Sequence, residues 1–176
     1  MEIIETEGER IETEGKTLRT GIGYDVHKLT AGRRLVLGGV EIEHFVGLEG
    51  HSDADVLVHA IMDALLGAAG LRDIGVYFPD TDIKYKDISS LVLLGMVKVS
   101  VKDAGYRILN IDSVVILEEP KISPFIPLMK KNISEALEIS IGQIGIKATT
   151  SEGLGFCGAK EGAAAQSVAL LAPMAE

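Results

Sequence analysis

The sequence predicts a single α/β domain, an α+β sandwich in which helices pack on one face of a mixed β-sheet. The chain has 176 residues and a mass of 18.7 kDa, which suits one compact domain. Apolar residues make up 47% of the composition and charged residues 24%, as in globular rather than disordered chains. Segments with strand-like alternation are separated by segments with helical periodicity, which favours a layer of helices on a sheet.

The first half contains the pattern of a strand, a hairpin and a helix. Residues 18–29 have apolar side chains at alternate positions, as in a strand with one buried face. Residues 34–42 fit a short hairpin with a Gly-Gly turn. Ser52 or Asp53 can cap the helix that follows, which continues to about residues 67–70.

The second half alternates in the same way. Its predicted elements are, in order, an exposed loop at 73–82, a helix at 89–104, a strand at 111–117, a helix after Pro124, a strand at 145–149 and an Ala-rich helix at 162–172. Because strands and helices alternate, one mixed sheet with helices on one face is the simplest arrangement.

Residues 1–17 form an acidic extension without a predicted catalytic role, and residues 18–176 form the predicted domain. The net charge of −9 opposes attraction to nucleic acids or anionic membranes. No apolar run approaches the roughly 20 residues of a membrane span, and Cys157 alone cannot form an intrachain disulfide. We therefore expect no nucleic-acid or membrane partner and a reducing compartment. The extension is acidic, unlike Arg-rich transit peptides, which favours bacterial cytoplasm over a plastid.

Asp25 and His27 form the sharpest local motif. Two positions apart on a strand, their side chains project from one face and can bind one ion. His59 is a natural third ligand, and an Asp, His, His set with an open position is typical of a catalytic zinc site. Asp55 and Asp63 lie four residues before and after His59, so either could orient its ring. Taken alone, these residues also fit a surface pair and a core histidine on an acidic helix.

Two further segments could bind phosphate or a second cation. Residues 51–53 lie at a predicted helix start, where unpaired N–H groups favour anions, although Ser52 also fits a simple cap. Residues 149–151 supply three hydroxyls for phosphate oxygens, and Glu152 can bind a hard cation such as magnesium. A Thr-rich strand end followed by a glycine turn explains the same pattern without a ligand. Residues 118–123 are a weaker candidate, since a strand exit with proline needs no ligand.

Taken together, these segments resemble the 2-C-methyl-D-erythritol 2,4-cyclodiphosphate synthase family of the non-mevalonate isoprenoid pathway. The similarity extends from about residue 20 to the C-terminus. Its motifs occur in the order Gly23-Tyr24-Asp25-Val26-His27, Leu37-Gly38-Gly39-Val40, His51-Ser52-Asp53-Ala54-Asp55, His59, Asp63-Ala64-Leu65-Leu66-Gly67-Ala68, Asp73-Ile74-Gly75, Phe78-Pro79-Asp80-Thr81-Asp82, Pro120-Lys121 and Lys147-Ala148-Thr149-Thr150-Ser151-Glu152.

The resemblance implies a homotrimer with active sites between neighbouring subunits. It assigns zinc to Asp25, His27 and His59, and it assigns a second divalent cation, magnesium or manganese, to Glu152. It ascribes transition-state stabilisation to His51 and Thr150. The substrate-binding positions that it implies are Asp25, His27, His51, Ser52, Asp73, Gly75, Phe78, Pro79, Asp80, Thr81, Asp82, Leu117, Pro120, Lys121, Ile122, Ser123, Ala148, Thr149, Thr150, Glu152 and Phe156.

The implied reaction is an intramolecular displacement that needs no protein nucleophile. The 2-phosphate of 4-diphosphocytidyl-2-C-methyl-D-erythritol 2-phosphate attacks the β-phosphorus and CMP leaves. Two alternatives stay open: a metal-dependent phosphohydrolase acting on a nucleoside-diphosphate substrate, and a non-enzymatic trimeric nucleotide-binding module. The sequence departs from the family at Ala159, where many members have an Arg that contacts phosphate. Lys160 could supply charge one position later, but it lacks the bidentate fork of Arg.

Overall fold

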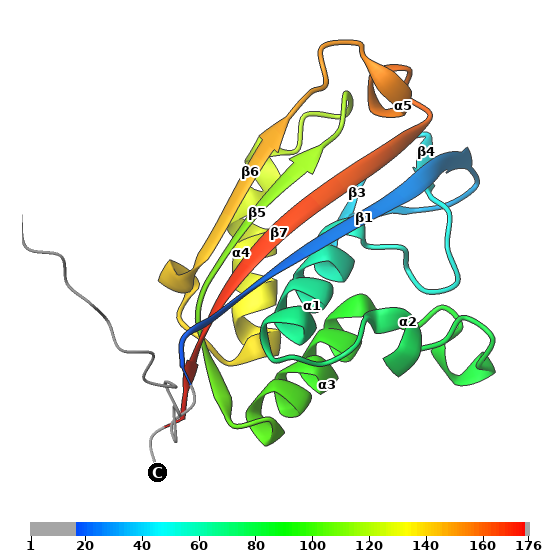
Figure 1. Ribbon diagram of the computed structural model, residues 1–176. Coiled ribbons are helices and arrows are strands. Elements are labelled where there is room, and N and C mark those ends of the chain that lie inside the picture. Colours follow the sequence, from blue (N-terminus) through cyan, green and yellow to red (C-terminus); the bar gives the residue numbers. More distant parts are fainter. Residues whose placement is uncertain (1–16, 175–176) are drawn as a thin grey trace, which may run out of the picture.

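A computed structural model describes residues 17–174, which build a five-stranded mixed sheet (Figure 1). The strand order is β4 (Val46–Leu48), β1 (Arg19–Ala31), β7 (Gly162–Pro173), β5 (Tyr106–Ile116) and β6 (Ile144–Thr149). Only β5 and β6 pair in parallel, and a separate hairpin joins β2 (Leu35–Leu37) to β3 (Val40–Ile42). The predicted acidic extension, except residue 17, lies outside the described residues.

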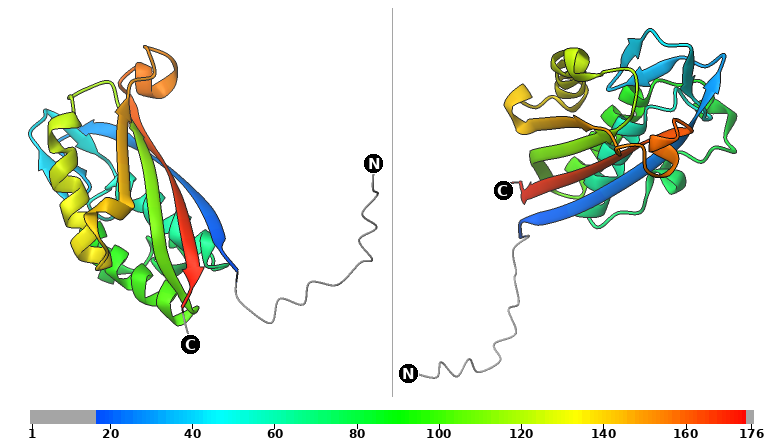
Figure 2. Two further views of the ribbon diagram at one scale, coloured as in Figure 1. Left: turned by 90° about the vertical axis from the view of Figure 1, so that its left-hand side faces the viewer. Right: turned by 90° about the horizontal axis from the view of Figure 1, so that it is seen from above.

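The three long helices cover one face of the sheet, as predicted (Figure 2). They are α1 (Val56–Ala68), α3 (Ser90–Asp103) and α4 (Ile126–Leu137), and the short helices are α2 (Ile74–Tyr77) and α5 (Gly155–Gly158). On β1 the even-numbered side chains from position 20 to position 28, such as Tyr24, are exposed on the other face, whereas Gly23 is buried. The predicted single α/β domain is therefore confirmed. Among the described residues, the helices are too short or too polar to cross a bilayer.

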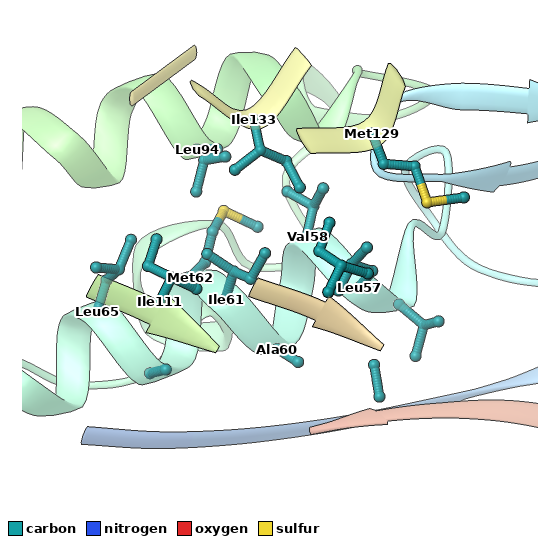
Figure 3. Packing of buried hydrophobic residues seen from close by; sticks show 14 of the residues in the cluster. Leu57, Val58, Ala60, Ile61, Met62, Leu65, Leu94, Ile111, Met129 and Ile133 are labelled. Atoms are coloured by element: carbon teal, nitrogen blue, oxygen red, sulfur yellow. The ribbon is translucent and has the colours of Figure 1, made fainter. Parts of the chain in front are cut away.

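The core forms where α1 packs against the sheet, α3 and α4 (Figure 3). Leu57, Ile61 and Leu65 of α1 are fully buried together with Ile111 of β5 and Ile133 of α4. Burial of each such side chain stabilises the fold by roughly 1.5–3 kcal/mol. This packing holds α1, and with it His59, rigidly beside β1.

Two glycines of β1 let α1 approach the strand closely. A Cβ atom added at Gly21 would lie 2.1 Å from the Ala64 carbonyl oxygen, and one added at Gly23 would lie 2.0 Å from that of Ala60. Only glycine leaves room for this helix backbone. Asp25 and His27 continue the same face of β1, so the close contact brings His59 of α1 to them.

The prediction of an Ala-rich helix at residues 162–172 is wrong, because this segment is the central strand β7. It pairs with β1 on one side and β5 on the other. Ala163, Ala165 and Ala169 face the helices and are fully buried, whereas Val168 is 45% exposed on the open face. Small side chains are needed where α1 crosses the sheet, and this packing overrides the intrinsic helix propensity of alanine.

The remaining elements match their predictions with small shifts. The hairpin turns at Gly38 and Gly39, both at positive φ, and α3 ends just before Gly105. The N-cap of α1 is Asp55, not Ser52 or Asp53. Asp55 takes this position because its carboxylate accepts the Val58 N–H, which satisfies an unpaired donor of the first turn.

Candidate functional site

Asp25, His27 and His59 converge on one point between β1 and α1. Asp25 Oδ2 lies 3.0 Å from His27 Nε2 and 3.0 Å from His59 Nδ1. The two ring nitrogens are 3.1 Å apart. Asp25 and His27 therefore project from one face of the strand, as predicted. The third side chain, His59, comes from α1, and the three form a cluster that could hold a metal ion.

The donor set suits a zinc ion. His27 Nδ1 lies 2.7 Å from Glu49 O, and a ring that donates this hydrogen bond directs its Nε2 lone pair into the cluster. His59 Nε2 lies 2.9 Å from Ser90 Oγ, which leaves its Nδ1 lone pair for the cluster in the same way. One carboxylate and two imidazoles with a free fourth position are typical of catalytic zinc.

The prediction that Asp55 or Asp63 orients the His59 ring is corrected by the structure. The Asp55 carboxylate accepts N–H groups of Gly39 and Val58, and Asp63 accepts the Ile74 N–H. Each carboxylate accepts hydrogen bonds from otherwise unpaired backbone N–H groups instead. Burial raises the pKa of Asp55 to about 6. Ser90, which no sequence pattern singled out, contacts the ring in their place.

The cluster also shifts the protonation of its own members. Burial would raise the pKa of the Asp25 carboxyl, but hydrogen bonds from His27 and His59 outweigh it and hold this pKa well below its usual 3.8. Burial would lower the pKa of His27, but the hydrogen bond and charge of Asp25 raise it above 6.5. Asp25 is therefore an anion that attracts cations, whether protons or metal ions.

A cavity of about 410 Å³ opens beside the cluster, bordered by His27 and His59. The predicted substrate residues that line it are His27, His51, Ser52, Gly75, Phe78 and Asp80. Tyr85, Met62, Ile74 and Leu93 also line it and were not predicted. Asp25, Asp73, Pro79, Thr81 and Asp82 are not among the lining residues. The side chains of Asp73 and Asp82 instead cap short helical turns.

The start of α1, where the sequence predicts an anion site, carries side chains that accept backbone N–H groups. Ser52 Oγ and Asp53 Oδ1 accept the N–H groups of Ala54 and Asp55, and the Asp55 carboxylate occupies the cap itself. Two carboxylates at the helix start repel an anion despite the dipole. His51 and Ser52 line the cavity beside the cluster.

Comparison with known proteins shows the family to which this chain belongs. The YgbB family profile matches residues 18–172. A 2-C-methyl-D-erythritol 2,4-cyclodiphosphate synthase from Clostridium acetobutylicum is 62% identical over 154 residues, which cover 88% of this chain and 99% of that protein. The chain belongs to the YgbB family of 2-C-methyl-D-erythritol 2,4-cyclodiphosphate synthases.

Solved structures of similar proteins share the fold. IspF from Plasmodium falciparum in complex with CDP is 36% identical with a TM-score of 0.80, and the match covers 92% of this chain and 99% of that one. The bifunctional IspDF from Campylobacter jejuni is 44% identical with a TM-score of 0.86. That match covers 89% of this chain and 42% of the bifunctional one, so this chain spans less than half of its length.

The segment at residues 147–152, which resembles the cyclodiphosphate synthase family, begins on β6. It lies at the same end of the sheet as the Asp25 cluster but on another strand. Val26, Ala164, Ile116 and Thr149 are aligned across β1, β7, β5 and β6. Three strand spacings of about 4.8 Å separate the two outer positions by about 14 Å. Within one chain, Thr149 therefore lies three strands away from the strand that carries Asp25 and His27.

The turn after β6 presents its polar groups to solvent. Thr150 Oγ1 donates to Glu152 Oε1 at 2.7 Å, and Ala148, Thr149, Thr150 and Glu152 are all exposed. Glu118 Oε1 accepts the Ser151 N–H at 2.8 Å, and this bond lowers the pKa of Glu118. The 118–123 segment thus braces the turn, a role that the sequence did not predict.

The residues predicted to bind substrate around this turn fall into two groups. Leu117 and Ile122 have buried side chains. Pro120, Lys121 and Ser123 are partly or fully exposed. Phe156 borders a second cavity of about 710 Å³, which also reaches His27.

Lys160 is not free to take the place of the arginine that many family members have at the position of Ala159. Its Nζ atom lies 2.8 Å from Glu119 Oε2, so its charge is already paired. Ala159 is exposed beside it. The charge next to the Phe156 cavity is therefore weaker than an unpaired Arg would provide.

Proposed function

We propose that the chain converts 4-diphosphocytidyl-2-C-methyl-D-erythritol 2-phosphate into 2-C-methyl-D-erythritol 2,4-cyclodiphosphate and CMP. The observation that carries this proposal is the Asp25, His27, His59 cluster opening onto a cavity in a chain of this family. Attacking and leaving groups belong to one substrate molecule. The protein therefore needs no nucleophile, and positioning can supply roughly 7–11 kcal/mol of the barrier.

Asp25, His27 and His59 would hold zinc, and Glu152 would hold magnesium or manganese. When bound, these cations polarise the attacked phosphate and offset the charge that builds up on the departing CMP. Exposed Glu152 offers the hard oxygen ligand that magnesium prefers.

His51 and Thr150 would stabilise the transition state as hydrogen-bond donors. His51 lines the cavity next to the metal cluster, where it can reach the phosphates. The cavity residues Ser52, Gly75, Phe78 and Asp80 would hold the methylerythritol phosphate. The exposed turn at 148–150, with residues 117–123, would hold the cytidine.

The working enzyme would be a homotrimer. The open face of the sheet exposes apolar side chains, with Ile22 63%, Tyr24 57% and Val168 45% exposed, and such a patch is typical of an interface. The separation of about 14 Å between Thr149 and Val26, which stands between Asp25 and His27 on β1, supports the same assembly, because a neighbouring copy can supply the missing half of each site. We place this enzyme in the bacterial cytoplasm, with residues 1–17 as a non-catalytic extension.

The proposal is tested by incubating the protein with the diphosphocytidyl substrate and following the products by phosphorus NMR. We expect CMP and a cyclic diphosphate in equal amounts. Release of CMP with linear phosphates only would identify a phosphohydrolase instead. A matched His59→Ala variant should bind less zinc and form neither product.

A further inference from the structure

We propose that Arg33 is a positioning residue of the metal site, which acts through the segment at residues 48–52. This inference rests on the proposed zinc site. Arg33 lies in the connection between β1 and β2, outside every segment predicted to be functional. Its side chain is two-thirds buried, and its hydrogen bonds go to the backbone of one segment.

The guanidinium group of Arg33 donates hydrogen bonds to three carbonyl oxygens. Its Nε atom lies 3.3 Å from Leu48 O. One terminal nitrogen lies 3.1 Å from Gly50 O and 2.8 Å from Ser52 O. Residues 49–55 have no helical or strand structure, so no regular ladder orients the Gly50 and Ser52 carbonyls. A planar charged fork with fixed donors can do so, which a flexible ammonium group cannot.

The same segment contacts both histidines of the cluster. Glu49 O lies 2.7 Å from His27 Nδ1, and Ser52 Oγ lies 3.3 Å from His59 Nε2. His51, between these two residues, lines the cavity. A displaced segment would change the backbone partner of His27 and one of the two hydroxyl partners of His59, so Arg33 influences ligands that it does not touch.

Arg34 offers a matched control at the next position. Its side chain is 70% exposed and pairs with Glu41 at 3.1 Å. Replacement of Arg34 removes the same positive charge from the same connection but leaves the three carbonyl contacts intact. Any difference between the two positions therefore reports on those contacts, together with the longer pairing of Arg33 with the exposed Asp87 at 3.8 Å.

The experiment compares Arg33→Ala and Arg33→Lys with Arg34→Ala and Arg34→Lys. Zinc affinity is measured by chelator competition without substrate, and kcat and KM are measured separately. We expect Arg33→Ala to bind zinc roughly 10–100-fold more weakly and to lose kcat more than KM, as for other residues that support metal ligands. The zinc affinity of Arg33→Lys should lie between those of the wild type and Arg33→Ala. If Arg33→Ala does not fold, Arg33→Lys alone still tests the proposal. Free guanidinium ion should restore part of the zinc affinity of Arg33→Ala only.

Unchanged zinc affinity in both Arg33 variants would overturn the proposal. Equal losses in the Arg34 variants would overturn it too, because charge alone would then explain the effect. Zinc affinity is measured without turnover, so a wild-type protein that makes no cyclic diphosphate refutes the proposed function while the role of Arg33 is still decided.

Discussion

Ser90 Oγ lies 2.9 Å from Nε2 of His59 and bridges this ring to the Asp53 carboxylate. A hydroxyl that donates to Asp53 can accept a hydrogen bond from the Nε2–H group of His59. The Nδ1 lone pair of His59 is then free to bind a metal ion. The fully buried Ser90 thus orients the ring from the first turn of α3.

Ser90→Ala should weaken zinc binding by roughly 10–100-fold, because the ring loses the nearer of its two hydroxyl partners and keeps only Ser52 Oγ at 3.3 Å. The neighbouring Ser89 is an ideal control, since it is exposed and its side chain makes no capping hydrogen bond. Chelator competition on Ser90→Ala and Ser89→Ala checks the prediction. Equal affinities in the two variants would assign Ser90 to packing alone.

Zinc binding should weaken as the pH falls through the pKa of His27. In the metal-free protein Asp25 raises this pKa above 6.5, despite burial, so a proton competes with the metal below it. Each competing proton lowers the apparent affinity about tenfold per pH unit. The stability of the metal-free fold depends on pH in the opposite direction. The raised pKa of His27 stabilises this fold fully below pH 6.5, and the contribution is lost as the pH rises through the folded-state pKa.

Zinc titrations between about pH 5.5 and about pH 8 measure this dependence. His44→Ala should keep the wild-type profile, since His44 packs on Phe45. A profile without any decrease at acid pH would show that His27 is not a ligand.

Glu152→Gln should lower turnover on the order of 100-fold by weakening a bound cation. Its effect on the melting temperature should be small, because an exposed carboxylate seldom contributes more than about 1 kcal/mol to folding. Glu135→Gln, at an exposed glutamate of α4 that pairs with Lys131, serves as the control. Normal turnover combined with a large loss of stability would give Glu152 a structural role.

Gly23→Ala should destabilise the fold by about 1–3 kcal/mol and weaken zinc binding, because the new Cβ atom pushes α1 and His59 away from β1. Gly67→Ala provides the contrast on α1 itself. Its added Cβ atom meets nothing closer than 3.9 Å, so this helical substitution should stabilise by roughly 0.5–1 kcal/mol. Denaturant unfolding of both variants measures the difference, and equal effects would refute the close-contact argument.

Local spacing in the sequence determined the parts of the site that lie on one element. Asp25 and His27 share a face because side chains in a strand alternate with a period of two, whatever packs against them. The helix that carries His59 was recognisable from its apolar periodicity. Family motifs then supplied roles that spacing alone left open.

Tertiary structure decided what joins these elements. Ser90 and His59 are 31 positions apart, and only the packing of α3 against α1 makes them partners. The 162–172 segment is a strand because β1 and β5 both form backbone hydrogen bonds with it. The intrinsic propensities of its residues do not include the energy of these bonds. Arg33 likewise acquires its contacts only when residues 48–52 fold against it. The backbone's covalent geometry fixes spacing within an element, whereas contacts between elements depend on how the whole core packs.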